Sequence, residues 1–436
     1  MRRAAARAGH RDPFAGPRPG LGRLPRPGDG GDGGYVATES TDPAFLIGAA
    51  GGTARPKLVI HVHGGYAVGV HAMGRWAYGL DPGDVWWATS DIGWIVGHSY
   101  MVYGPLMAGC TTVVHEGAPD HPDADALWRV VEEERVTGLF VSPTAVRLLR
   151  GHGDEPPARH DLSSLRRVFC AGEPLEAEVW AWLQHDALGD RVPVLDNWWQ
   201  TETGGPVIGY PYGLGPVEIR PGSAGVALPG AELAVVDDDG AELPPGEEGL
   251  LVLRRPMPAL SPGIWGEPDR YAHDYLDPVP GAWFTGDAAR IDEDGYVRVP
   301  GRADEIITSA AHRIGAVEVE AALESHPAVR EAGVTMGPDE LRGETVVAFA
   351  VLREGPAPGD ALREELVAAV RGELGPLVAV GEIRFVAALP RAGDGALMRR
   401  VLRAVVLDLD PGDLTVAERA GTPEEARAAW AAMRAA

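Results

Sequence analysis

The feature that most constrains the fold is an alternation of strand-like and helix-like segments in the first half of the chain. Val85–Ala88 follows a turn of Asp, Pro, Gly and Asp, and its apolar residues are typical of a buried strand. Apolar residues between 125 and 136 recur at the spacing of an amphipathic helix, and 138–143 is again typical of a strand. This order of strand, helix and strand predicts a parallel sheet covered by helices, and therefore an α/β fold.

The rest of the chain differs from this segment in composition. Residues 1–40 are rich in Arg, Gly and Pro without hydrophobic periodicity, which predicts a disordered leader. Short β-rich runs between 222 and 253 alternate with glycine turns and predict a small antiparallel barrel. Helix and strand patterns of a compact α+β unit cover 317–325, 331–336, 345–352 and 361–374. We expect a leader over 1–40, a large domain over 41–302, an α+β domain over 303–410 and a tail over 411–436.

The charge balance excludes some classes of partner. A formal charge of −24 over 436 residues argues against non-specific binding to nucleic acid or to an anionic membrane surface. No apolar run is long enough to span a bilayer, and the basic N-terminus lacks the apolar segment of a secretory signal. Cys110 and Cys170 both lie in apolar runs, which predicts buried thiols and a cytoplasmic protein.

Asp196–Gly205 is the segment richest in side chains that bind ligands. It follows a short apolar strand pattern at 193–195, and open α/β sheets bind small ligands at such strand ends. Its two indoles offer a flat face for a purine or an acyl group, and Thr201 and Glu202 suit phosphate and magnesium. A buried aromatic pair beside a solvated turn explains the same composition equally well.

Three further motifs decide between these interpretations: Gly172–Pro174, Phe284–Asp287 and Pro300–Glu305. Together with Asp196–Gly205, they resemble the adenylate-forming superfamily, and within it the AMP-forming acetyl-CoA synthetases, or acetate–CoA ligases. The resemblance implies the adenylate-forming fold, in which a large domain with a parallel sheet and a small β-barrel precedes a small α+β domain. It covers nearly the whole chain from Asp42 to Arg403.

The resemblance assigns most of these motif residues to ATP or AMP binding. Asp287 would accept hydrogen bonds from both ribose hydroxyls, and Arg302 would reach the ribose or a phosphate. Asp304 matches the hinge about which the C-terminal domain swings between the two half-reactions. The nucleotide-binding residues that the resemblance implies are Gly172, Glu173, Pro174, Asp196, Asn197, Trp198, Trp199, Gln200, Thr201, Asp287, Arg302 and Arg313.

The resemblance also implies a pocket for the acyl group. Its lining would be Trp94, Ile95, Val96, Ala171 and Trp199. The indole of Trp199 would shorten the pocket and select a short acyl chain. Val96 stands where the family has a Thr and Ala171 where it has a Val. One or two methylenes of discrimination correspond to only about 1–3 kcal/mol, so acetate and propionate both stay open.

CoA and magnesium are placed in the C-terminal part by the same resemblance. CoA would lie near Ala311 and Arg371, although the family has at 311 a Gly that lets the pantetheine arm pass. The family's magnesium loop aligns with Glu324, His326 and Val329, and part of its contacts come from the main chain.

The chain departs from the family at its phosphate loop. The matching segment, 48–58, keeps one hydroxyl at Thr53 and two cations at Arg55 and Lys57. Leu58 replaces a Gly, and most of the family's hydroxyls are missing. Because such loops bind phosphate through closely approaching backbone N–H groups, hydroxyls and a cation, we expect a weaker phosphate grip.

Two larger departures concern activity. Ala396 stands where the family has the lysine that stabilises the forming acyl-adenylate, and Asp394 adds charge of the wrong sign. Losing one such electrostatic contact typically costs about 2.7–4 kcal/mol, so adenylation should be severely impaired. The family's N-terminal third is also missing upstream of Asp42, which predicts exposed sheet edges and apolar faces.

The resemblance therefore implies an acetate–CoA ligase that uses ATP, CoA and magnesium to activate a short carboxylate, with adenylation impaired. A ligase that retains only thioester formation is one alternative. A non-catalytic protein that binds AMP or a partner subunit, or a decaying gene product, is another. A partner chain that supplies the missing N-terminal region is compatible with each of them.

Overall fold

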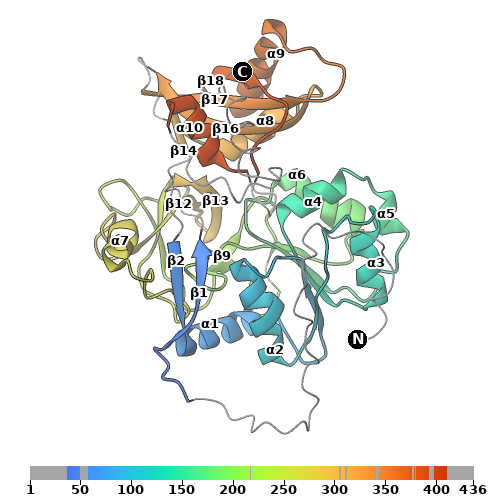
Figure 1. The fold of residues 1–436 in the computed structure, drawn as a ribbon, viewed down its shortest axis with the longest axis vertical. Coiled ribbons are helices and arrows are strands. Elements are labelled where there is room, and N and C mark those ends of the chain that lie inside the picture. The colour runs from blue at the N-terminus through green and yellow to red at the C-terminus, as the bar shows by residue number, and fades with distance from the viewer. Residues whose placement is uncertain are drawn as a thin grey trace, which may run out of the picture. The chain divides into compact units, whose positions relative to one another are not determined.

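The computed structural model describes residues 37–49, 57–216, 218–303, 306–309, 312–339, 343–375, 378, 380–391 and 397–409 (Figure 1). All the helices and strands lie within the compact unit Glu39–Ala436.

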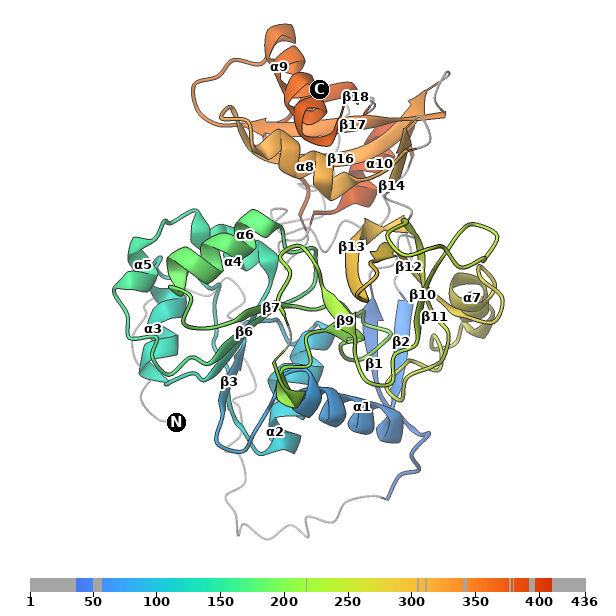
Figure 2. The ribbon, with the colours of Figure 1, turned by 180° about the vertical axis from the view of Figure 1, so that it is seen from behind.

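A five-stranded parallel sheet forms the first part of this unit. Its strand order is β4 (Thr111–Val113), β3 (Val85–Ala88), β5 (Gly138–Val141), β6 (Arg167–Cys170) and β7 (Val194–Asp196). Neighbouring helices are α3 (Ala126–Glu133), α4 (Pro143–Arg150), α5 (Glu155–Ala158), α6 (Ala177–Ala181) and η2 (Trp182–Ala187), most of which are visible in Figure 2. The central strands β5 and β6 are buried on both faces, which explains why their apolar residues do not alternate with polar ones.

An antiparallel pair, β1 (Pro43–Ala49) and β2 (Lys57–Val62), leads directly into α1 (His63–Trp76). The helical segments η1 (Gly97–Tyr103) and α2 (Gly104–Ala108) pack against α1. One face of the pair contributes Ile47 and Val59 to the core, whereas Leu46 and Leu58 on the opposite face are 39% and 45% exposed. Leu46 and Leu58 thus expose apolar surface on this face of the pair.

A six-stranded antiparallel sheet follows, and it curls into a half-barrel. Its order is β10 (Leu233–Val236), β11 (Gly249–Leu253), β12 (Trp283–Ile291), β13 (Tyr296–Arg302), β9 (Gly225–Ala227) and β8 (Ile208–Gly209). Short helical turns accompany it at η3 (Tyr212–Leu214), α7 (Pro268–Tyr271) and η4 (Ala272–Leu276). The pairing of β12 with β13 sets Asp287 opposite Arg302, which brings two motifs of the sequence together.

The C-terminal part is a small α+β unit. Its elements are β14 (Ile306–Ser309), β15 (His312–Gly315), α8 (Ala316–Glu324), β16 (Val329–Asp339), β17 (Gly343–Leu352), α9 (Asp360–Leu374), β18 (Val380–Phe385) and α10 (Arg399–Leu407). In the sheet β16-β17-β18, β17 runs antiparallel to β16 and parallel to β18. Helices α8 and α9 bury their apolar residues with one face of this sheet, and α10 packs with the other.

The structure confirms the α/β class and the elements expected from periodicity. The strands at β3 and β5, the helix α3 and the α+β pattern of the C-terminal part lie where the sequence placed them. The boundaries at 41, 303 and 411 stay predictions. Among the residues that the structure describes, no helix is both long and apolar enough to cross a bilayer.

Candidate functional site

Motif residues gather at one edge of the parallel sheet. Gly172–Pro174 lie just beyond the end of β6, and Asn197–Thr201 follow β7, whose last residue, Asp196, pairs with Cys170. Trp94–Val96 come after β3 in the same sheet. Because the carboxyl ends of parallel strands meet at one edge, segments far apart in the sequence converge there.

Asp287 is the centre of this arrangement. Its carboxylate is buried, and Oδ2 accepts hydrogen bonds from Trp198 Nε1 at 3.1 Å and from Gln200 Nε2 at 2.7 Å. The guanidinium of Arg302 lies 3.7 Å from Oδ1 and also donates to the carbonyl of Thr285 at 3.1 Å. The motifs of β7, β12 and β13 thus meet around one carboxylate.

The turn that carries Thr201 and Glu202 is held by its backbone carbonyls. His61 Nε2 donates to the carbonyl of Thr201 at 2.8 Å, and the backbone N–H of Ser261 donates to that of Glu202 at 2.7 Å. The Ser99 hydroxyl donates to the carbonyl of Gly204, also at 2.7 Å. Three separate elements therefore fix the path of this short segment.

His61 is a buried side chain that supports this turn and is not among the predicted site residues. Burial lowers its pKa to about 4, so the ring is neutral near pH 7 and can donate from Nε2. Its Nδ1 is buried without a hydrogen-bond partner among the described residues. Its place at the end of an ordinary-looking strand gave no sequence signal, because its partner lies in the turn after β7.

Two of the predicted nucleotide-binding side chains serve as structural anchors. Glu173 accepts hydrogen bonds from the Thr144 backbone N–H at 2.6 Å and from Arg147 Nη2 at 2.5 Å. Asn197 donates to the Cys170 carbonyl at 2.8 Å and accepts from the Tyr78 hydroxyl at 3.0 Å. These side chains fasten the loops beyond β6 and β7.

Two other polar groups in this region are suited to a ligand. Gln200 Oε1 is buried and has no hydrogen-bond partner among the described residues. Burial raises the pKa of the Asp196 carboxyl well above its usual range, so it can stay protonated and donate a hydrogen bond. An unsatisfied acceptor and a potential donor match the edge of a purine base, which carries both kinds of group.

Four of the five predicted acyl-pocket residues share one apolar core. Ile95, Ala171 and Trp199 are all buried in it, and Val96 packs against it. The Trp199 indole meets the rings of Tyr100 and Phe140 edge-on, at centroid distances of 5.5 and 6.5 Å. Trp94 is half-buried and is not a member of this core cluster.

Lys57 differs from the expectation that it grips a phosphate. Its ammonium lies 2.8 Å from Asp274 Oδ2 and donates to the Tyr275 hydroxyl at 3.3 Å. Only 9% of Lys57 is exposed. The positions 50–56 of the predicted phosphate loop lie outside the described residues.

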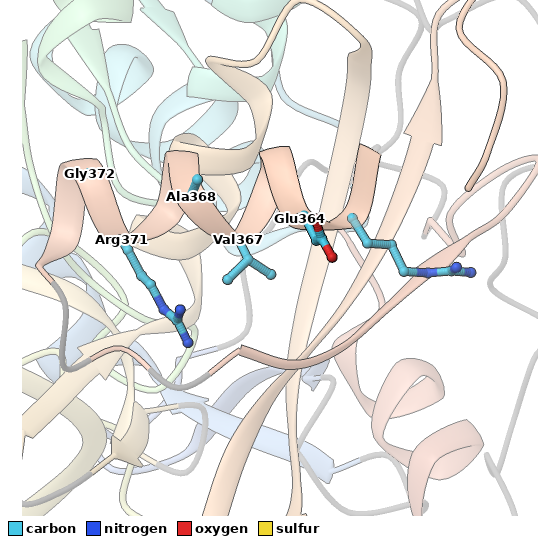
Figure 3. A pocket seen from close by; sticks show the side chains of 6 residues that line it. Glu364, Val367, Ala368, Arg371 and Gly372 are labelled. Atoms are coloured by element: carbon cyan, nitrogen blue, oxygen red, sulfur yellow. The ribbon is translucent and has the colours of Figure 1, made fainter. Parts of the chain in front are cut away.

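The predicted CoA-binding residues are described only in part. Arg371 lies on α9 beside an open groove of about 530 Å³, and Figure 3 shows its side chain projecting to the same side as Val367. Arg313 lies on β15, where its backbone pairs with Thr308. Ala311, the hinge residue Asp304 and the lysine position Ala396 lie outside the described residues.

In the segment predicted to bind magnesium, Glu324 and His326 accept backbone N–H groups, and His326 Nε2 also lies 3.6 Å from Glu365 Oε2. Glu324 Oε1 accepts from the Ala332 backbone N–H at 2.8 Å, and His326 Nδ1 accepts from that of Ala328 at 3.2 Å. Val329 begins β16 and pairs with Leu352. Within the described part of the chain, no group of three or more His, Cys, Asp or Glu side chains is placed to hold a metal ion.

Comparison with protein families matches both parts of the chain. Residues 19–265 match the AMP-binding enzyme family, and residues 318–396 match the AMP-binding enzyme C-terminal domain. The first match includes the turn after β7, and the second covers most of the C-terminal α+β unit.

The curated relatives that the chain resembles are CoA synthetases. Acetyl-coenzyme A synthetase of Pyrobaculum aerophilum is 45% identical over 91% of this chain and 59% of its own length. 3-Hydroxypropionyl-coenzyme A synthetase of Sulfurisphaera tokodaii is 44% identical over 90% of this chain and 60% of its own length. The chain therefore spans about three fifths of the length of these relatives.

A solved structure shows the same fold. The anthranilate CoA ligase AuaEII in complex with anthranoyl-AMP superposes with a TM-score of 0.73 at 27% identity. The match covers 85% of this chain and 69% of the ligase.

Proposed function

Because the chain belongs to the AMP-binding family of adenylate-forming enzymes, we propose that the turn after β7, together with Asp287 and Arg302, binds the AMP moiety of ATP and of an acyl-adenylate. The observation that supports this most directly is the convergence of Trp198, Gln200 and Arg302 on the buried carboxylate of Asp287. Such a buried carboxylate is a strong acceptor for ribose hydroxyls.

The reaction we propose is that of a short-chain acyl-CoA ligase of the acetate–CoA ligase type. A carboxylate oxygen attacks the α-phosphorus of ATP, pyrophosphate leaves, and the CoA thiol then attacks the acyl carbonyl and releases AMP. The buried indole of Trp199, with Ile95 and Ala171 in the same core, supports a short acyl group. Trp94 and Val96 complete the proposed lining.

The turn also carries Glu202, whose carboxylate is suited to bind magnesium. Mg²⁺ in nucleotide sites is usually held by one or two carboxylates together with phosphate oxygens and water, so a dense cluster of acidic residues is not required. Bound magnesium would neutralise charge on the phosphates. The backbone near Glu324, His326 and Val329 is the second place where we propose a magnesium contact.

CoA binding would use the C-terminal part. We assign the pantetheine arm to the segment with Ala311 and Arg313 and a CoA phosphate to Arg371, which lies on the open groove of α9. Asp304 would act as the hinge between the adenylation and thioester-forming orientations. The two free thiols, Cys110 and Cys170, fit a reducing compartment, and we place the reaction in the cytoplasm.

Adenylation would be the weak step. With Ala396 in place of a lysine, no side-chain cation from that position would stabilise the charge that builds on the α-phosphate oxygens. Thioester formation from a supplied acyl-adenylate does not need that lysine. A protein that only binds AMP is the remaining alternative, and the intact surroundings of Asp287 are compatible with it.

The region of the relatives that this chain does not match would cover its exposed apolar residues. The outer face of β1 and β2, the stripe on η1 and α2, and the end of β4 all carry them. They are Leu46, Leu58, Tyr103, Leu106, Met107 and Val114. We propose that a polypeptide with that region, in a longer chain or as a partner chain, packs here. Co-expression with the unmatched part of the Pyrobaculum relative should give a co-purifying complex, and Leu46→Asp with Leu58→Asp should abolish it.

Three measurements test the functional proposal. Calorimetry should detect AMP binding, and its absence would refute the nucleotide site. Acetate-dependent exchange of pyrophosphate into ATP tests adenylation, which we expect to be weak. Supplying acetyl-AMP with CoA tests thioester formation: acetyl-CoA without exchange identifies the thioester-only ligase, and neither product identifies a binding protein.

A further inference from the structure

The side chain of Glu202 is tied to a set of residues that lies outside all the motifs. The Tyr275 hydroxyl donates a hydrogen bond to Glu202 Oε1. Tyr275 belongs to η4, 73 positions further along the chain, and it is 5% exposed. Its ring stacks on Trp283 at a centroid distance of 5.0 Å with only 5° between the planes. The phenol therefore reaches Glu202 from a rigid, packed support.

Lys57 holds the other side of the same phenol. Its ammonium donates to the Tyr275 hydroxyl at 3.3 Å and lies 4.7 Å from the ring centroid. Asp274 fixes the ammonium at 2.8 Å, and Arg270 lies 3.6 Å from the same carboxylate oxygen. A hydroxyl that accepts from a cation is a better donor to a carboxylate, because hydrogen bonds in a chain polarise one another.

Lys57 is the first residue of β2, and it pairs with Ala49, the last residue of β1. The Lys57 side chain thus links the base of the predicted phosphate loop to the carboxylate beside Thr201. A phosphate-gripping role would need an ammonium free to turn toward a ligand, whereas this one is enclosed by Asp274 and Tyr275.

We propose that Tyr275 and Lys57 are positioning residues that orient the Glu202 carboxylate toward a nucleotide-bound Mg²⁺. The hydroxyl occupies Oε1 and so presents the other oxygen, Oε2, to the cation. This inference rests on the proposed nucleotide site and adds two residues to it. Partners that orient a metal ligand typically change metal affinity or activity by about 10- to 100-fold when they are removed.

The test compares Tyr275→Phe with Tyr271→Phe. Tyr271 stands one turn earlier, and its ring lies 5.1 Å from that of Tyr275 at a tilt of 44°. Its hydroxyl donates to the Ser261 carbonyl at 2.7 Å, not to Glu202. Calorimetry would measure ATP affinity with Mg²⁺ and with EDTA. We expect Tyr275→Phe to reduce the gain from Mg²⁺ by roughly 10- to 100-fold and Tyr271→Phe to leave it within about twofold. Equal Mg²⁺ gains in Tyr275→Phe and the wild type would overturn the proposal.

Lys57→Met separates positioning from phosphate binding. A positioning lysine predicts a loss confined to the Mg²⁺-dependent part of ATP affinity, with partial recovery in Lys57→Arg. A phosphate-gripping lysine predicts an equal loss of ATP affinity in EDTA, which would contradict the proposal.

A second readout needs no nucleotide and so distinguishes failure of this inference from failure of the proposed function. Tyr275→Phe and Glu202→Ala should lower the Tm by amounts that do not add in the double variant, because each removes the hydrogen bond between the Tyr275 hydroxyl and Glu202. Tyr271→Phe and Glu202→Ala should add. Additive shifts for the first pair would refute the positioning role even in a protein that binds no AMP.

Discussion

The turn after β7 and the segment at the end of α8 both carry residues that the family resemblance assigns to ligands, yet the molecule uses them differently. In the turn, Trp198 reaches across 89 positions to Asp287. In the segment, Glu324 and His326 accept backbone N–H groups only 8 and 2 positions away. Trp198 thus links two separate segments around the buried Asp287, whereas Glu324 and His326 satisfy backbone N–H groups close to them in the sequence. We therefore expect substitutions in the turn to change binding and those in the segment to change stability.

The largest expected effect would come from restoring the missing cation in the C-terminal part. Ala396→Lys should raise acetate-dependent pyrophosphate exchange by roughly 10²–10³-fold, since one fixed charge at developing negative charge contributes about 2.7–4 kcal/mol. Ala392→Lys adds the same charge at another position and should leave the rate near its starting value. Equal exchange rates in the wild type, Ala396→Lys and Ala392→Lys would show that a lysine at 396 does not restore adenylation to the site at the turn.

His61 tests whether the turn is held as rigidly as its contacts indicate. Because burial lowers the pKa of His61 to about 4 while the unfolded chain titrates near 6.5, the unfolded state binds more protons between these values. Stability is therefore fully present above pH 6.5 and falls as the pH drops toward 4, by on the order of 3 kcal/mol. His61→Gln keeps a side-chain N–H donor and should flatten this dependence.

Urea unfolding at pH 7.5 and pH 4.5 would measure the effect. His71→Gln, on the exposed face of α1, removes a histidine without touching the turn and should keep the wild-type difference between the two pH values. If His61→Gln kept that difference too, the Thr201 carbonyl would not be held by a buried neutral imidazole.

Much of this turn was predictable from the sequence, because the information is local. The order of strand, helix and strand predicts parallel strands, and the carboxyl ends of such strands share one edge, so Gly172–Pro174 and Asp196–Thr201 had to lie near one another. The pairing of β12 with β13 then placed Asp287 opposite Arg302. This part of the prediction rested on the spacing of the motifs along the sequence.

The contacts that the sequence did not reveal are pairings of charged or polar side chains across long separations. Lys57 and Tyr275 are 218 positions apart, and neither hydrophobic periodicity nor turn chemistry relates them. Glu173 pairs with Arg147 of α4, and its motif does not predict this contact. Such partners depend on the tertiary arrangement, and one sequence contains no local signal for them.

Asp287→Asn tests whether the carboxylate at the centre of the site binds the ribose. The amide keeps the shape of the carboxylate but loses its charge, and hydrogen bonds to charged groups contribute about 1.5–3 kcal/mol. We expect AMP affinity to fall by roughly 10- to 100-fold in calorimetry. Asp292→Asn removes a carboxylate that pairs with Arg220 beyond the end of β12, and it should lower stability without changing AMP affinity. A loss of affinity in both variants would point to general destabilisation instead of a ribose contact.

The smallest expected effect lies in the segment at the end of α8. His326→Ala removes the acceptor of the Ala328 N–H, and a single neutral hydrogen bond contributes about 0.5–1.5 kcal/mol, so the free energy of unfolding should fall by about 1 kcal/mol. His326→Asn keeps an acceptor near that N–H and should recover part of the loss. Because a magnesium contact in this segment would come from its backbone, neither variant should change the Mg²⁺ dependence of ATP binding. A clear loss of that dependence in His326→Ala would instead show that the imidazole is a magnesium ligand. The side chains at the end of α8 would then bind a ligand, as those of the turn are expected to do, and the contrast between the two regions would be wrong.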